Sequence, residues 1–395
     1  MSESVTRPLV IIFLTVFVNL IGFGIIIPLL PFYAETFGAS PLVIGLLFAV
    51  FSICQLVAAP VLGDLSDRRG RRPVLIFSLA GTVASFVMLA LAHSLVMLFL
   101  ARVVDGLSGG NISTARAYIA DITEPKDRAR AYGLLGAAFG LGFIVGPAIS
   151  GVLARINYTA PIWAAAFITL VATLVAWLWL PETVHRAHAG TGMPFRYLPA
   201  LMRRAGLGRI LAIDFVYWTA FAIFQTTFAL VAARRFAFDV PQTGYFFSAF
   251  GLLGAVVQVA LIRPTVRRLG DKATFVVGIA CAAAGLVAAA LAPSVVIFVG
   301  SLVPLAIGIG LGHPTVVSLV SRAARGDEQG RVQGAASALE SLGRTVGPVW
   351  GNASLQHWGA GVPYYSGAGL LLLALLMSVG YQVADSGGAA IEPSA

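Results

Sequence analysis

Charged side chains are scarce in this 395-residue sequence. Asp, Glu, Lys and Arg make up 11% of the residues, whereas soluble domains carry about a quarter. Hydrophobic residues make up 58%. A water-soluble core of this size does not need so much apolar surface, so the composition excludes an ordinary soluble domain and indicates an integral membrane protein.

Cysteine is nearly absent as well. Cys54 and Cys281 fall in separate apolar segments, so their number and placement exclude a disulfide framework, and we interpret each as a small buried hydrophobic residue. The sequence has no histidine pair that combines metal-ligand spacing with a supporting shell, no Walker-type phosphate loop, and no nucleophile–base set in a plausible active site. We therefore expect no metal, no cofactor and no enzymatic activity.

Apolar segments of about 20 residues are abundant, and this is the length that an α-helix needs to cross about 30 Å of hydrocarbon. We predict an all-α membrane protein with twelve transmembrane helices. They span 8–32, 43–62, 73–93, 96–119, 131–154, 161–181, 208–232, 243–262, 273–292, 294–318, 331–352 and 362–384. The first is too long for a signal-peptide apolar region and is interpreted as a retained helix.

Basic residues are distributed by loop. Of the 26 Lys and Arg residues, 20 fall on one side of the predicted helices and only Arg155, Arg234 and Arg235 fall on the other. This positive-inside pattern predicts a bacterial-type inner membrane protein with both termini in the cytoplasm. The net charge of +9 therefore reflects topology, and no nucleic-acid partner is expected.

A weak internal repeat divides the chain into two halves. Four residues of the fifth segment recur 201 positions later in the eleventh: Gly133, Gly142, Gly146 and Pro147 match Gly334, Gly343, Gly347 and Pro348. We predict an N-terminal six-helix bundle over 1–181, a cytoplasmic linker over 182–207, and a C-terminal six-helix bundle with a short cytoplasmic tail over 208–395. Secondary transporters built from such repeats bind substrate between the halves and alternate access by rocking one against the other.

A charged motif follows the second segment and reads Gly63-Asp64-Leu65-Ser66-Asp67-Arg68-Arg69-Gly70-Arg71-Arg72-Pro73. Its glycines permit a tight turn, and Asp67 can accept hydrogen bonds from a helix N-terminus or pair with arginines. We predict a breakable cytoplasmic latch, with a partner cluster of Asp121, Arg128 and Arg130. The alternative is that the charges only keep the loop in water. The predicted gating residues are Gly63, Asp67, Arg68, Gly70, Arg71, Arg72 and Asp121.

The fifth segment carries a second motif, Gly142-x-x-x-Gly146-Pro147-x-x-x-Gly151. Glycines four residues apart allow close helix contact, and Pro147 removes a backbone hydrogen bond and bends the helix. With the charged motif, and with Arg102, Gly106 and Gly110 in the fourth segment, the sequence resembles the major facilitator superfamily. Its N-terminal half is similar to the tetracycline-resistance exporters of the drug/proton antiporter branch.

Charged residues inside the predicted helices each cost at least about 2.5–3.5 kcal/mol unless paired or hydrated. Arg102 and Asp105 are three residues apart, and Glu340 and Arg344 are four apart, so each pair shares a helix face. A carboxylate beside arginine stays ionised, whereas one that loses its arginine in an apolar setting takes up a proton. We predict proton coupling by these four residues and Asp214. The alternatives are structural neutralisation for both pairs and hydration at the cytoplasmic surface for Asp214.

Six other residues are predicted to bind substrate. They are Asn19, Gln55, Arg116, Tyr217, Gln225 and His313. The two amides Asn19 and Gln55 have an alternative role in hydrogen bonding a neighbouring helix, and aromatic residues such as Tyr217 have an alternative role in packing. For His313, a helix broken at Pro314 would expose the imidazole to a cavity, and the alternative is a structural histidine.

The substrate is expected to differ from tetracycline. As the resemblance implies, the tetracycline exporters carry an acid where this chain has Asn19, and further acids in the third and ninth helices. Here Ser85 and Phe86 occupy the third helix, and the ninth has no acid. The sequence predicts a monomeric proton-coupled antiporter that exports a small amphipathic organic compound, drug-like and neutral, zwitterionic, anionic or cationic. The alternatives are a proton-coupled importer of a polar organic solute and a non-transporting membrane sensor.

Overall fold

The computed structural model describes residues 3–109, 111–124, 127–183, 194–324 and 328–380, and its regular elements over these ranges are all helices. The bounds are α1 Glu3–Glu35, α2 Pro41–Arg69, α3 Arg71–Ala90, α4 Leu95–Ser108, α5 Asn111–Ile122, α6 Arg128–Leu153, α7 Ala160–Trp179, α8 Pro194–Met202, α9 Ala205–Phe236, α10 Val240–Ala260, α11 Ile262–Leu291, α12 Val295–Gly300, α13 Leu302–Ala323, α14 Gln329–Trp358 and α15 Val362–Ser378. The all-α prediction is confirmed.

Twelve apolar stretches correspond to the twelve predicted segments. In the part of the chain that the structure describes, ten are long and apolar enough to span a membrane. The other two are α14, which has 30 residues and is more polar, and α15, which has 17. Two spans are each built from two helices, α4 with α5 and α12 with α13.

The charged motif is mostly helical, which corrects the prediction of a loop. α2 continues to Arg69, Gly70 alone makes the turn with φ of 107°, and α3 begins at the next residue. Within this last stretch of α2, Asp64 and Arg68 form an i,i+4 ion pair of 3.0 Å, a spacing that is compatible with helix. Glycine takes the positive φ without the steric cost that a side chain would bring.

The predicted break at His313 is also wrong. α13 runs without interruption through Pro314, and the helix boundary in this span falls instead at Ser301. The hydroxyl of Thr315 donates to the carbonyl of Leu311 at 2.6 Å, one of the local bonds that accompany the proline turn.

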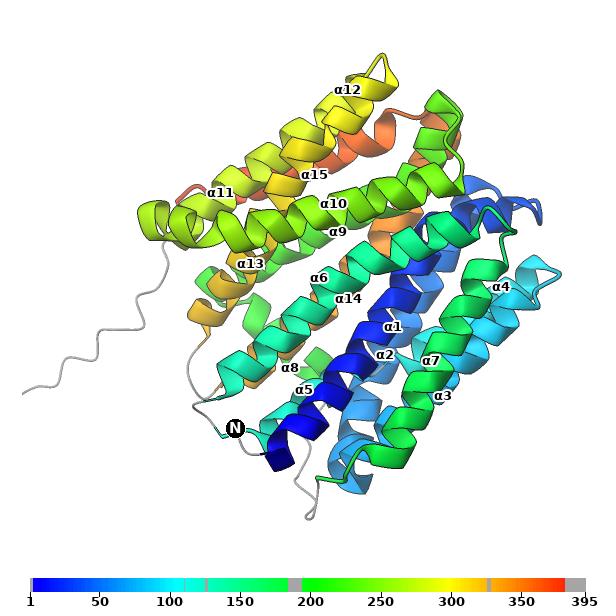
Figure 1. Cartoon of the computed structure of the whole chain (residues 1–395). Coiled ribbons are helices and arrows are strands. Elements are labelled where there is room, and N and C mark those ends of the chain that lie inside the picture. The colour runs from blue at the N-terminus through cyan, green and yellow to red at the C-terminus, as the bar shows by residue number, and fades with distance from the viewer. Residues whose placement is uncertain (1–2, 110, 125–126, 184–193, 325–327, 381–395) are drawn as a thin grey trace, which may run out of the picture.

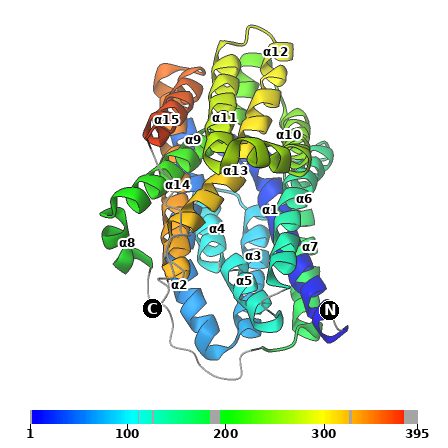
Figure 2. The same cartoon turned by 90° about the vertical axis from the view of Figure 1, so that its left-hand side faces the viewer.

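The helices form two bundles, α1–α7 and α9–α15, with α8 packed against α14 (Figures 1 and 2). The repeated glycines have equivalent roles in the two bundles. A Cβ at Gly146 of α6 would lie 2.6 Å from the Ile21 carbonyl oxygen of α1, and a Cβ at Gly347 of α14 would lie 2.7 Å from the Thr219 carbonyl oxygen of α9. The small residues therefore allow close backbone contact at matching places. The bounds of the linker, 182–207, stay a prediction, and 184–193 lie outside the described residues.

Among the described residues, the contacts of α2 with α14 and of α6 with α10 lie toward one end of the two bundles. There α2 contacts α14, where the Leu42 amide donates to Gln356 Oε1 at 3.1 Å. Likewise α6 contacts α10, where Ser248 Oγ donates to the Ile144 carbonyl at 2.7 Å. Figure 1 shows α6 and α10 converging toward this end. Toward the other end of α6, a side chain at Gly133 would meet no atom within 4 Å. The bundles are thus closed opposite the charged motif and separated beside it.

Candidate functional site

The charged motif forms a network within the N-terminal bundle. Arg71 is its centre: its Nη1 pairs with Asp67, and its Nε donates to Asp121 Oδ2 at 2.9 Å. These contacts join the ends of α2, α3 and α5. Among the described residues Asp67 pairs with Arg71, and this arginine links it to Asp121 of the predicted partner cluster. The side chains of Arg128 and Arg130 lie outside the described residues.

A carboxylate caps the N-terminus of α3 in the same network. Glu182, just after α7, accepts hydrogen bonds from the backbone N–H of Arg71 at 2.9 Å and of Arg72 at 3.2 Å. A negative charge at this position satisfies amides that lack helical partners and interacts favourably with the helix dipole. The contact ties the last transmembrane helix of the bundle to the charged motif.

Replacing Glu182 by alanine is expected to lower the free energy of unfolding by about 1–2 kcal/mol, because the two α3 amides lose their acceptor. The measurement is thermal or denaturant unfolding of the purified protein in detergent. The matched control is Glu35→Ala, at an exposed position near the end of α1, which is expected to change stability by about 0.5 kcal/mol or less. Equal losses in the two variants would contradict the capping role.

The C-terminal bundle contains a charge-reversed counterpart of this network. Gly270 has a positive φ of 78°, and the next residue, Asp271, accepts from Arg322 at 3.0 Å. In the first bundle the corresponding turn has Gly70 before Arg71, which pairs with Asp121. The Asp271–Arg322 pair was not among the sequence predictions. The signal was present, since Asp271 follows Arg71 by 200 positions and Arg322 follows Asp121 by 201.

Two residues of α4 form a buried ion pair. Arg102 Nη1 and Asp105 Oδ2 are 2.7 Å apart, and Arg102 is 1% exposed. The guanidinium carbon lies 4.2 Å from the centre of the Phe51 ring on α2. The predicted proximity of the two charges is confirmed. Among the described residues, Nε and Nη2 of Arg102 have no hydrogen-bond partner, so the guanidinium keeps unused donors.

Glu340 and Arg344 do not form the predicted pair, since no ion pair within 4.0 Å joins these two described residues. Arg344 instead reaches α9, where its guanidinium carbon lies 5.3 Å from the Trp218 ring centre, and it donates to Ser341 Oγ at 3.2 Å. The His313 ring stands edge-on to Trp218 with centroids 5.3 Å apart. The four-residue spacing of Glu340 and Arg344 on α14 did not reveal that Trp218 of α9 competes for the arginine.

Asp214 is buried at 1% exposure, so the alternative of a hydrated surface position is wrong. Its Oδ2 has no hydrogen-bond partner among the described residues. α9 begins nine residues earlier and packs closely on α14, which covers this turn. Glu340 and Arg344 lie on α14, where a Cβ at Gly343 would lie 3.2 Å from the Phe215 carbonyl oxygen, next to Asp214 in sequence.

The predicted substrate residues differ in burial and in hydrogen bonding. Asn19 is half-buried and makes no hydrogen bond to a described residue, and Arg116 is exposed on α5. Gln225 is 7% exposed on α9. Gln55 donates to the Gly109 carbonyl at 3.2 Å, at the junction of α4 and α5. The Gln55 amide therefore makes the helix-to-helix contact that was its alternative role.

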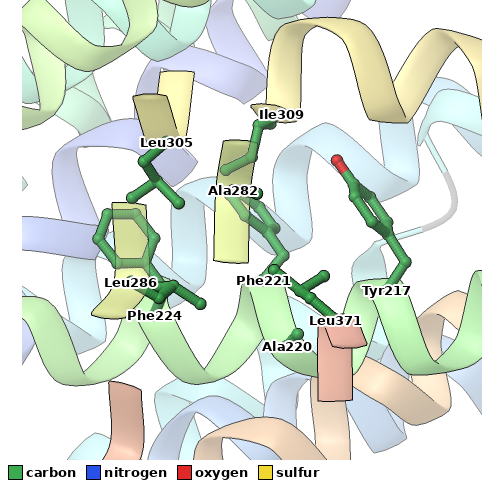
Figure 3. A pocket seen from close by; sticks show the side chains of 9 residues that line it. All are labelled: Tyr217, Ala220, Phe221, Phe224, Ala282, Leu286, Leu305, Ile309 and Leu371. Atoms are coloured by element: carbon green, nitrogen blue, oxygen red, sulfur yellow. The ribbon is translucent and has the colours of Figure 1, made fainter. Parts of the chain in front are cut away.

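Tyr217 faces the interior of the C-terminal bundle. Figure 3 shows it beside Phe221 and Phe224 on α9, facing Leu305 and Ile309 of α13 across a cavity of about 10 Å³. This volume is about that of one water molecule, so the cavity is too small for an organic substrate. Tyr217 therefore packs within the bundle in this conformation, whereas its neighbour Trp218 meets Arg344 and His313.

Comparisons with known proteins identify relatives over most of the chain. The sequence model of the Major Facilitator Superfamily matches residues 12–348 and 210–392. The chain is 34% identical to the class G tetracycline resistance protein of Vibrio anguillarum, over 86% of this chain and 88% of that protein. It is 33% identical to the class C tetracycline resistance protein of Escherichia coli, over 93% and 95%. The crystal structure of the human organic anion transporter MFSD10 is similar with a TM-score of 0.74 at 25% identity, over 95% of this chain and 100% of that one.

Proposed function

The chain belongs to the major facilitator superfamily and is a multi-pass membrane transporter, and from this premise we propose that it is a proton-coupled antiporter exporting a small amphipathic, drug-like compound. The tetracycline resistance proteins among its relatives support export rather than import. The positive-inside pattern supports insertion in a bacterial inner membrane with both termini in the cytoplasm.

The observation that carries the proposal is the buried ion pair of Arg102 and Asp105 on α4. In this proposal the Asp105 carboxylate is ionised while it is paired with Arg102. When substrate or a change of conformation draws the guanidinium away, the carboxylate is left in an apolar setting and takes up a proton. The free Nε and Nη2 donors of Arg102 give it the means to change partners. Asp105 is our first candidate for the proton site, and Glu340 and Asp214 are the second.

Alternating access follows from the way the bundles meet. With the proposed topology, the closed end faces the outside of the cell, and the separated end beside the charged motif faces the cytoplasm. This is the conformation that takes up substrate for export. The Arg71 network, which lies wholly within the N-terminal bundle here, is free to change partners when the cytoplasmic ends approach each other. Asn19, Gln225, Arg116 and His313 are the side chains that we propose for substrate contact.

Reconstituted vesicles test the proposal directly. With an acidic interior and a neutral exterior, the wild-type protein is expected to accumulate ethidium and to dissipate the pH gradient, and empty vesicles provide the control. An ionophore that collapses the gradient should abolish accumulation. Movement of dye and protons in the same direction would replace antiport by the importer alternative. Absence of movement for ethidium, rhodamine 6G and fluorescein would favour the non-transporting alternative.

A further inference from the structure

The Arg344 side chain contacts Trp218, but a second partner, Glu340, is within its reach. Arg344 lies over the Trp218 indole ring at 5.3 Å, although Glu340 is only one turn away on the same helix. Residues four apart on a helix can form an ion pair without any change of backbone. The Trp218 Nε1 is buried and has no hydrogen-bond acceptor among the described residues. The indole thus offers a face that Arg344 occupies and a donor that nothing uses.

Two carboxyl groups near this ring are without direct partners. Neither Asp214 nor Glu340 makes an ion pair within 4.0 Å or a side-chain hydrogen bond with a described residue, and Asp214 is 1% exposed. α9 and α14 are close here, since a Cβ at Gly343 would lie 3.2 Å from the Phe215 carbonyl oxygen. Two unpaired carboxylates in such a place repel each other, and sharing one proton relieves the repulsion.

We propose that the indole face of Trp218 is the subsite for a planar aromatic group of the substrate, and that Arg344 couples its occupation to proton release. This inference rests on the proposed antiport. When the substrate ring takes the indole face, the Arg344 guanidinium moves to Glu340. The carboxyl O–H bond of the acid pair breaks, its electron pair stays on the oxygen, and the proton passes to water. No other bond changes, and no redox partner is needed.

The surrounding charges select the class of substrate. The site receives Asp214 from α9, Glu340 and Arg344 from α14, and His313 from α13. A planar aromatic cation brings one positive charge as one proton leaves, so the charge of the site is unchanged. An aromatic anion would pair with Arg344 and keep it away from Glu340, so its binding would release no proton.

The test measures ligand binding and proton release on the purified full chain in detergent, with a pH indicator in weak buffer. Ethidium should bind to the wild type and release up to about one proton per protein, and fluorescein should release none. Trp218→Leu should weaken ethidium binding by at least about tenfold, because a cation–π and stacking contact is lost. The matched control is Trp163→Leu on α7, where the side chain is exposed, and it should bind ethidium as the wild type does.

Arg344→Gln separates coupling from a structural role. Loss of the side chain that competes for the indole should leave ethidium affinity equal to that of the wild type or higher, while proton release disappears. Arg344→Lys, which keeps the charge, should restore part of the release. Wild-type release in Arg344→Gln, wild-type affinity in Trp218→Leu, or no ethidium binding to the wild type would each overturn the inference. If vesicles exchange dye for protons and both variants do so normally, this inference fails while the proposed antiport stands. If wild-type vesicles exchange nothing, the antiport itself fails.

Discussion

Valine in place of Gly244 is expected to slow transport by at least about tenfold while the protein still folds. A Cβ at this position of α10 would lie 2.5 Å from the Pro147 carbonyl oxygen and 2.8 Å from the Gly151 amide nitrogen of α6. Both are backbone atoms and cannot rotate away. Overpacking costs about 1–3 kcal/mol, and here it falls on the contact that closes one end of the transporter. The transport cycle should therefore be biased away from the conformation seen here, in which α6 and α10 close one end of the transporter.

The chain offers a matched control on the same helix. A Cβ at Gly254 would meet no atom within 4 Å, so Gly254→Val should transport at close to the wild-type rate. The measurement is ethidium transport in vesicles, beside labelling of a cysteine placed at Leu42 by a membrane-impermeant maleimide. Faster labelling is expected in Gly244→Val because the end that contains Leu42 opens more often. Normal transport in Gly244→Val would show that the α6–α10 contact does not control access.

Asparagine in place of Asp105 is expected to abolish proton-coupled transport and to destabilise the protein by about 3–5 kcal/mol. The stability loss follows because Arg102 is 1% exposed and would keep a buried charge without its partner. The double variant Arg102→Gln with Asp105→Asn removes both charges, so it should recover most of the stability but none of the coupling. Unfolding in detergent and pH-driven transport in vesicles measure the two effects separately.

An exposed ion pair provides the control for Asp105. Asp64 and Arg68 are 3.0 Å apart, but their side chains are 42% and 69% exposed. Asp64→Asn should therefore cost no more than about 1 kcal/mol. Coupling by the stable double variant at the wild-type level would identify the Arg102–Asp105 pair as structural and move the proton site to the C-terminal bundle.

The sequence predicted the helices and their close contacts because these depend on local patterns. Apolar runs of membrane length predicted the twelve spans, and the repeat of Gly146 at Gly347 anticipated equivalent packing in the two bundles. The reach of Arg102 to Asp105 also followed, since the two residues lie three apart on one helix. In each case the contact depends on the spacing of residues along one helix or on positions that the internal repeat matches.

Contacts between side chains on different helices could not be predicted from the sequence. Arg344 was expected beside Glu340, but α9 presents Trp218 to it, and a single sequence does not show which helix supplies a neighbour. The burial of Asp214 depends in the same way on α14. The charged motif was expected as a loop from its composition, whereas α2 continues through it to Arg69 and places Asp64 and Arg68 at i,i+4. The proton-coupling and substrate roles themselves stay predictions.

The most direct measurement imposes a gradient of substrate and records protons, with no pH gradient at the start. Ethidium is added outside vesicles that hold wild-type protein and an internal pH indicator, beside vesicles that hold Asp105→Asn or Glu340→Gln. We expect the interior of the wild-type vesicles to become alkaline as protons leave in exchange for dye, and at least one variant to lose this response while it still binds ethidium. An interior that becomes acidic, or that stays unchanged while dye enters, would contradict antiport.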